Sequence, residues 1–272
     1  MAVASCGSLS ALTLGLPSAA AVGESKGTLP PQMFYAAAPV SSKLRQRFTT
    51  DIGGIHMLAV LTPANIGVAQ GSRIKEILIL ALDVRDQAIP TEIIEHIARM
   101  RASGMLFVCV RHRPEADSSA PSPSNGASRT SPDGRGEEEE CALAVLRTLP
   151  GRAGHIAQVR VFSGAWQPVR DMRLVLKDPR NPAGDMDGVW DTLSAQAILG
   201  SIDGGNIDER LALRERTRLL QAQEEKLARD HARAKNPNQR NELYAKLHKV
   251  RTELAGITGD RKSPSGPEPR RD

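Results

Sequence analysis

The chain has 272 residues, 40% of them hydrophobic but only 3% aromatic, and a formal net charge of +5. This length allows one or two domains, and the few aromatic side chains predict a core of Leu, Ile, Val and Ala, which suits helices packed on a sheet. The three cysteines, Cys6, Cys109 and Cys141, are far apart and form no CxxC pair. They indicate neither a disulfide framework nor a zinc site, so we expect a reducing compartment, no metal and no cofactor.

Residues 1–22 are apolar and rich in small side chains. They lack the basic start of a signal peptide, and Gly7, Gly15 and Pro17 interrupt the apolar run. We expect an N-terminal helical or flexible segment with a short helix around residues 9–16. No stretch reaches the ~20 apolar residues that a membrane span needs, which favours a cytoplasmic protein.

Residues 23–200 alternate between strand-like and helix-like patterns. Apolar runs at 55–61 and 76–84 predict strands, the second buried on both faces. Thr91 offers an N-cap for a helix that ends at Gly104, and residues 105–110 return as a strand, so strands 76–84 and 105–110 should be parallel. Residues 142–146 and 157–162 predict a hairpin joined through 151–154, and residues 190–199 a helix ending at Gly200. The predicted fold class is α+β, a mixed sheet domain with a C-terminal antiparallel helical hairpin.

Two segments have the composition of disordered chain. Residues 113–140 combine prolines with many Ser and Gly residues and end in four glutamates, so we expect a disordered insertion between two strands. Residues 259–272 are expected to form a disordered tail.

Residues 201–258 predict a coiled-coil-like hairpin of two helices, broken at Asn236, Pro237 and Asn238. The first helix has only a thin apolar stripe, at Leu213, Leu220, Leu227 and Ala234. In the second helix, apolar residues recur at spacings that alternate between four and three residues, and we call this apolar row the seam. Because the seam faces too little apolar surface, we expect it to bind a protein partner or another copy of the chain through Leu243, Leu247, Val250, Leu254 and Ile257.

The sequence offers no recognised catalytic constellation, because it has no GxGxxG, P-loop, HExxH or GxSxG motif. We therefore expect a binding protein and not an enzyme. Two alternatives remain open. Non-specific DNA binding could use the basic helices through Arg214, Arg218, Arg229, Arg233 and Lys249, and a divalent-metal nuclease could use Glu76 and Asp83.

The order of several short motifs resembles the bacterial family known as domain of unknown function 4391. The N-terminal part of the likeness lies in Lys26, Leu29-Pro30, Phe34-Tyr35, Phe48 to Ile52 with Asp51, Ile55, Leu61 to Pro63 and Asn65-Ile66. It continues through the strand at 76–84, Ile89-Pro90, Trp166, Asn238 and Glu242-Leu243. The chain departs from the family pattern at Pro31 and at His56-Met57, where members often carry a basic and an aromatic residue.

The resemblance implies no established activity, because the family is uncharacterised. Members are often encoded beside helicases and DNA methyltransferases of defence systems, so the resemblance implies an accessory component of a DNA-modification or phage-defence assembly. A helicase or methyltransferase would then be the protein partner, and no membrane would be involved.

Overall fold

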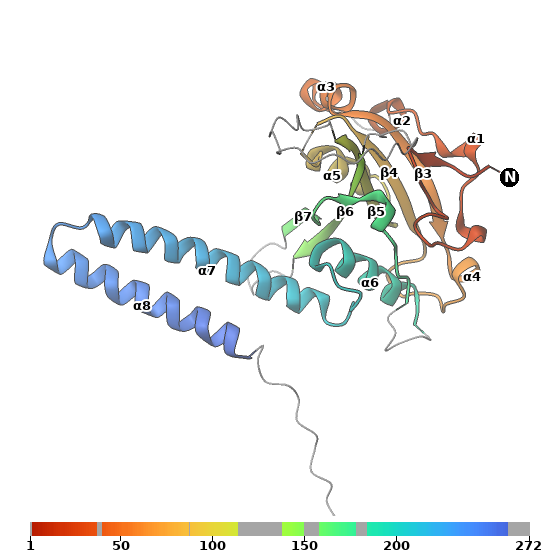
Figure 1. Ribbon diagram of the computed structural model, residues 1–272. Coiled ribbons are helices and arrows are strands. Elements are labelled where there is room, and N and C mark those ends of the chain that lie inside the picture. The colour runs from red at the N-terminus through yellow and green to blue at the C-terminus, as the bar shows by residue number, and fades with distance from the viewer. Residues whose placement is uncertain are drawn as a thin grey trace, which may run out of the picture. The chain divides into compact units, whose positions relative to one another are not determined.

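The computed structural model describes residues 2–36, 40–86, 88–113, 138–149, 158–177 and 184–260 (Figure 1). These residues form two compact units: a sheet unit, whose described residues lie within 2–148 and 158–205, and a helical unit that holds the last two helices. The predicted α+β class is confirmed, with a mixed sheet and a C-terminal antiparallel helical hairpin.

The described residues of the sheet unit form strands, α-helices and two short 3-10 helices. Its strands are β1 (Ser5–Cys6), β2 (Leu9–Ser10), β3 (Ile52–Leu61), β4 (Ile77–Val84), β5 (Gly104–Arg113), β6 (Glu138–Leu149), β7 (Gln158–Ser163) and β8 (Gln167–Pro168). Its helices are η1 (Ser18–Ala20), α1 (Glu24–Gly27), α2 (Gln32–Ala36), α3 (Ser42–Thr50), α4 (Pro63–Ile66), α5 (Thr91–Arg99), η2 (Val169–Asp171) and α6 (Met186–Leu199). The helical unit contains α7 (Ile207–Arg233) and α8 (Pro237–Asp260).

The main sheet runs in the order β3-β4-β5-β6-β7, and β8 pairs with β6. Strands β4 and β5 are parallel and are joined by α5, which confirms the predicted strand-helix-strand unit. Their neighbours β3 and β6 are antiparallel to them. Pro90, not Thr91, occupies the N-cap of α5, and Gly104 begins β5 instead of ending the helix.

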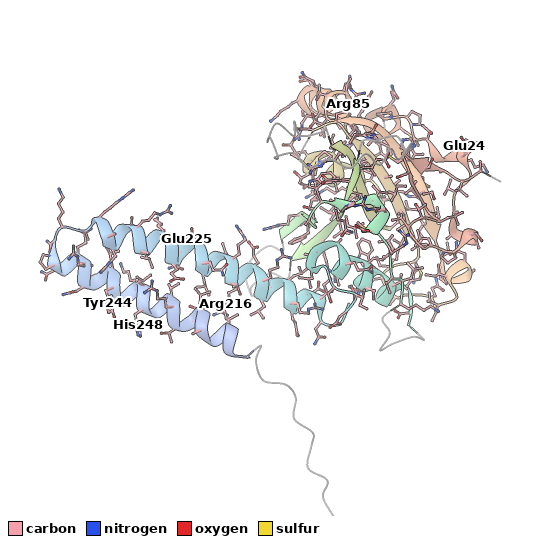
Figure 2. All side chains as sticks on the ribbon, in the orientation of Figure 1. Glu24, Arg85, Arg216, Glu225, Tyr244 and His248 are labelled. Atoms are coloured by element: carbon pink, nitrogen blue, oxygen red, sulfur yellow. The ribbon has the colours of Figure 1, made fainter. Side chains whose placement is uncertain are left out.

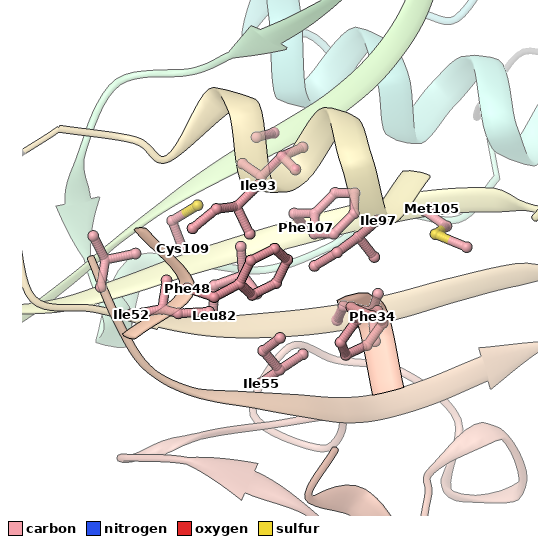
Figure 3. Packing of buried hydrophobic residues seen from close by; sticks show 14 of the residues in the cluster. Phe34, Phe48, Ile52, Ile55, Leu82, Ile93, Ile97, Met105, Phe107 and Cys109 are labelled. Carbon is pink, nitrogen blue, oxygen red and sulfur yellow. The ribbon is translucent and has the colours of Figure 1, made fainter. Parts of the chain in front are cut away.

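Strand β4 is buried on both faces, as its unbroken apolar run predicts. On one face, Leu80 and Leu82 join a cluster with Ile93 and Ile97 of α5 and with Phe107 of β5 (Figure 3). Each such side chain contributes on the order of 1.5–3 kcal/mol when it is removed from water. This packing fixes the sheet and the helix against each other.

The N-terminal segment is not the helix that we predicted around residues 9–16. Gly7, with a φ of 57°, makes the turn between β1 and β2; the buried Leu9 belongs to β2, and the buried Leu14 lies in the turns that follow. The chain then covers the outer edge of β3, where the amide of Val22 donates to the carbonyl of Leu58 at 2.9 Å. A segment that protects a sheet edge gains these hydrogen bonds, which a local helix would not provide.

Both ends of the disordered insertion that we predicted at 113–140 belong to strands. Arg113 still belongs to β5, and Glu138 already belongs to β6, so residues 138–140 are strand. The antiparallel register places Arg111 opposite Glu140 and His112 opposite Glu139, so the acidic run faces a basic one. Residues 114–137, and the predicted turn at 151–154, lie outside the described residues.

The ends of the last three helices match the sequence prediction in most respects. Helix α6 ends at Gly200, whose φ of 62° suits glycine. Helices α7 and α8 break where Asn236 and Pro237 predict. Helix α8 continues to Asp260, so the predicted tail at 259–272 starts too early, and residues 261–272 lie outside the described part of the chain.

Candidate functional site

The two helices of the helical unit are held in register by ion pairs across the hairpin. Arg216 of α7 pairs with Glu253 of α8 at 2.6 Å, and Glu224 of α7 pairs with Arg251 of α8 at 2.8 Å. In this antiparallel register Leu213 lies near the level of Ile257, and the apolar stripe of α7 faces the seam of α8. The pairs thus show the register of the two helices, and with it which apolar residues meet.

The seam is covered at its centre, which corrects our expectation that it faces too little apolar surface. Leu247 and Val250 are each only 5% exposed, and on α7 Leu220 is 8% exposed. The thin apolar stripe of α7 is enough to bury the centre of the seam, because it places one Leu per two turns opposite the seam. The remaining seam residues, Leu243, Leu254 and Ile257, are half-buried.

Three ring side chains lie together on the hairpin outside the seam, and we call them the aromatic patch: His231, Tyr244 and His248. The ring of Tyr244 lies 6.1 Å from that of His231 and 6.5 Å from that of His248. Tyr244 is 57% exposed (Figure 2). Sequence reasoning missed these residues, because the apolar pattern of the seam does not include them. The one signal in the sequence was Tyr244, an aromatic residue at a position outside the seam of a polar helix.

The basic residues predicted to bind nucleic acid do not share one surface. Arg214, Arg218, Arg229 and Arg233 are all exposed on α7, whereas Lys249 is exposed on α8. Arg218 is partly engaged, because it forms an ion pair with Glu215 of its own helix at 2.7 Å. The structure therefore brings the four arginines together on one helix and leaves Lys249 apart from them.

The carboxylates of the nuclease hypothesis lie at opposite ends of one strand. Glu76 precedes β4 and accepts a hydrogen bond from the Ser103 hydroxyl at 2.7 Å, while Asp83 is close to the other end, beside Gly53. Seven residues of strand separate them by about 23 Å, so they cannot bind one cation. Within the described ranges, no three His, Cys, Asp or Glu side chains come together as metal ligands.

Asp187, at the start of α6, accepts hydrogen bonds from three consecutive residues of the loop before β4. It accepts hydrogen bonds from the Ser72 hydroxyl at 2.6 Å and from the amides of Ser72, Arg73 and Ile74, the last at 2.7 Å. Burial by itself raises the pKa of Asp187, but these hydrogen bonds outweigh it and lower the pKa to about 2. The group fastens α6 to the loop before β4, and sequence reasoning did not find it.

The glutamates at the start of β6 are also held by other segments of the sheet unit. Glu139 accepts a hydrogen bond from the Ser8 amide at 2.9 Å and so holds the β1–β2 turn. Glu140 pairs with Arg111 at 2.6 Å, and the Arg111 guanidinium lies 4.1 Å from the centre of the Trp166 ring. These contacts are structural and leave the carboxylates little freedom to bind a ligand.

The three cysteines are poor nucleophiles. All three are buried and have free thiols. Burial, followed by nearby carboxylates, raises the pKa of Cys6 and of Cys141 to about 12, and burial raises that of Cys109 further still.

The residues of the family-like motifs do not converge on one pocket. In the sheet unit Lys26 and Pro30 are exposed, and Tyr35 meets the ring of Phe48 edge-on at 5.7 Å. Burial raises the pKa of Asp51, but hydrogen bonds from Thr50 and Arg47 hold it below its ordinary value. Asn238 lies in the helical unit, where its amide donates to Asn236 Oδ1 at 2.9 Å. Tyr35, Asp51 and Asn238 therefore each contact a partner within their own unit, and none of these contacts forms a ligand site.

A family model described as "Domain of unknown function (DUF4391)" matches residues 14–254, which confirms the predicted resemblance. No curated protein and no solved structure matches the chain. Among the described helices, none is both long enough and apolar enough to cross a membrane. The family match spans residues of both the sheet unit and the hairpin.

Proposed function

The chain belongs to the family described as domain of unknown function DUF4391, and we propose that it is a non-enzymatic accessory protein that docks a protein partner through its helical hairpin. The observation that carries the proposal is the aromatic patch. Tyr244 is a large side chain left 57% exposed, and its ring contacts those of His231 and His248. Tyrosine is enriched among the residues that dominate protein interfaces.

In this proposal the centre of the seam stabilises the hairpin, whereas from the sequence we predicted that the whole seam binds a partner. Leu247 and Val250 hold the hairpin together, because they are buried between its helices. The exposed parts of Leu243, Leu254 and Ile257 remain for a partner to cover. Following the family resemblance, the partner is a helicase or DNA methyltransferase encoded beside the gene, in a DNA-modification or phage-defence assembly in the cytoplasm.

Co-expression of the tagged full chain with that neighbouring helicase or methyltransferase tests the proposal. We expect a complex of fixed stoichiometry in size-exclusion chromatography with light scattering. Tyr244→Ala should weaken it by about 2 kcal/mol, roughly 30-fold in Kd, as loss of a central interface tyrosine does. Leu219→Ala is the matched control, because Leu219 is also exposed, at 55%, but lies on α7 outside the aromatic patch.

Two outcomes contradict the proposal. One is the absence of any complex, and the other is equal affinity of the Tyr244→Ala variant and the unaltered chain. A dimer of the chain alone that dissociates on Tyr244→Ala would instead identify a second copy as the partner of the patch.

A further inference from the structure

The side of α7 that faces away from α8 carries a row of cations, which we call the basic strip: Arg214, Arg218, Lys226, Arg229 and Arg233. At 100° per residue, its four arginines fall within an arc of about 100°. The centre of that arc is about 180° from the mean direction of Leu213, Leu220 and Leu227, which face the seam. All five side chains of the strip belong to exposed residues.

The strip is long, straight and only partly neutralised. From Arg214 to Arg233 it extends about 28 Å at 1.5 Å per residue. Glu215 and Glu225 lie on the same side, which leaves an excess of three positive charges. Among the described residues, Lys226, Arg229 and Arg233 have no carboxylate within ion-pair distance, whereas the acidic Glu224 and Glu253 are used in pairs across the hairpin.

We propose that the basic strip binds the phosphate backbone of a nucleic-acid duplex. A straight row of cations of this length spans about eight base pairs, and arginine suits phosphate because its planar guanidinium donates in a fork. Proteins that bind single strands stack bases on aromatic rings. Helix α7 contains no Phe, Trp or Tyr, which favours a duplex. The strip lies on the side of α7 away from α8, whereas Tyr244, His248 and the seam belong to α8, so this proposal is separate from protein docking.

Fluorescence anisotropy with a labelled duplex of about 20 base pairs and the full chain tests the proposal. We expect binding at about 50 mM KCl that weakens by roughly a hundredfold by about 200 mM, because about four phosphate contacts give a slope near −3.6 in log K against log salt. Arg229→Gln combined with Arg233→Gln should weaken binding roughly tenfold or more and reduce the size of the slope by about two.

The matched control is Lys246→Gln combined with Lys249→Gln, which removes the same charge from exposed residues of α8. This control should bind within about threefold of the unaltered chain. Equal loss in both double variants would overturn the proposal, because only the overall charge would then matter. Absence of binding at low salt would overturn it as well, and so would tighter binding to polyglutamate than to the duplex, which would identify an acidic protein as the partner.

Discussion

The sheet unit buries some of its charged side chains together with their partners, whereas the ion pairs across the hairpin of the helical unit are largely exposed. In the sheet unit, Asp187 and Glu140 are largely buried and have geometrically defined partners. In the helical unit, the paired side chains of Arg216 and Arg251 are 54% and 56% exposed. Buried networks fix a structure, whereas exposed pairs contribute little and leave charge available. This difference supports the proposal that the sheet unit is a rigid body and that the hairpin is the binding surface.

The largest expected effect is on the core of the sheet unit. Phe107 is fully buried in the cluster below α5, so Phe107→Ala should lower the free energy of unfolding by about 3–5 kcal/mol. Urea denaturation followed by circular dichroism measures this. Leu219→Ala on the hairpin should change it by less than about 0.5 kcal/mol, and similar losses in both variants would contradict the contrast between the units.

The next effect concerns the carboxylate that fastens α6. The pKa of Asp187 is lowered from its ordinary 3.8 to about 2, so its ionised form stabilises the fold by roughly 2 kcal/mol above about pH 4. This contribution should be lost as the pH falls from about 4 to about 2. Asp187→Asn should lose about the same free energy of unfolding at pH 7.

Denaturation of this variant across the pH range provides the check. The difference in stability between Asp187→Asn and the unaltered chain should shrink as the pH falls below about 4. A difference that stays constant down to pH 2 would show that the Asp187 carboxylate does not carry this part of the stability.

The smallest effect is expected for the exposed ion pairs of the hairpin. A double-mutant cycle on Arg216→Ala and Glu253→Ala should give a coupling of about 0.2–1 kcal/mol that falls with added salt. Coupling above about 2 kcal/mol would mean that this exposed pair behaves like the buried networks of the sheet unit, and the comparison would lose its basis.

Local pattern was enough to predict the elements whose partners are close in sequence. The apolar run of β4, the spacing of Ile93 and Ile97 on α5, and the stop at Gly200 each predicted what the structure has. The break at Pro237 was predicted for the same reason, because proline limits the helix by its own geometry.

The failures share a physical cause, which is dependence on contacts that are distant in sequence. The segment around Leu9 is held by the sheet, and Glu139 is ordered by Ser8, 131 residues away. Asp187 likewise binds a loop 113 to 115 residues before it. The burial of Leu247 depended on the register of the hairpin, which the exposed ion pairs help to set. Nothing in a single stretch of sequence specifies such partners.

Hydrogen–deuterium exchange of the full chain, free and mixed with the proposed helicase or methyltransferase partner, tests most directly whether the hairpin is the docking element. We expect slower exchange on binding in peptides that contain His231, Tyr244 and His248, with the peptides of β4 and β5 unchanged. Protection confined to the sheet unit, with the hairpin exchanging as in the free chain, would contradict the account.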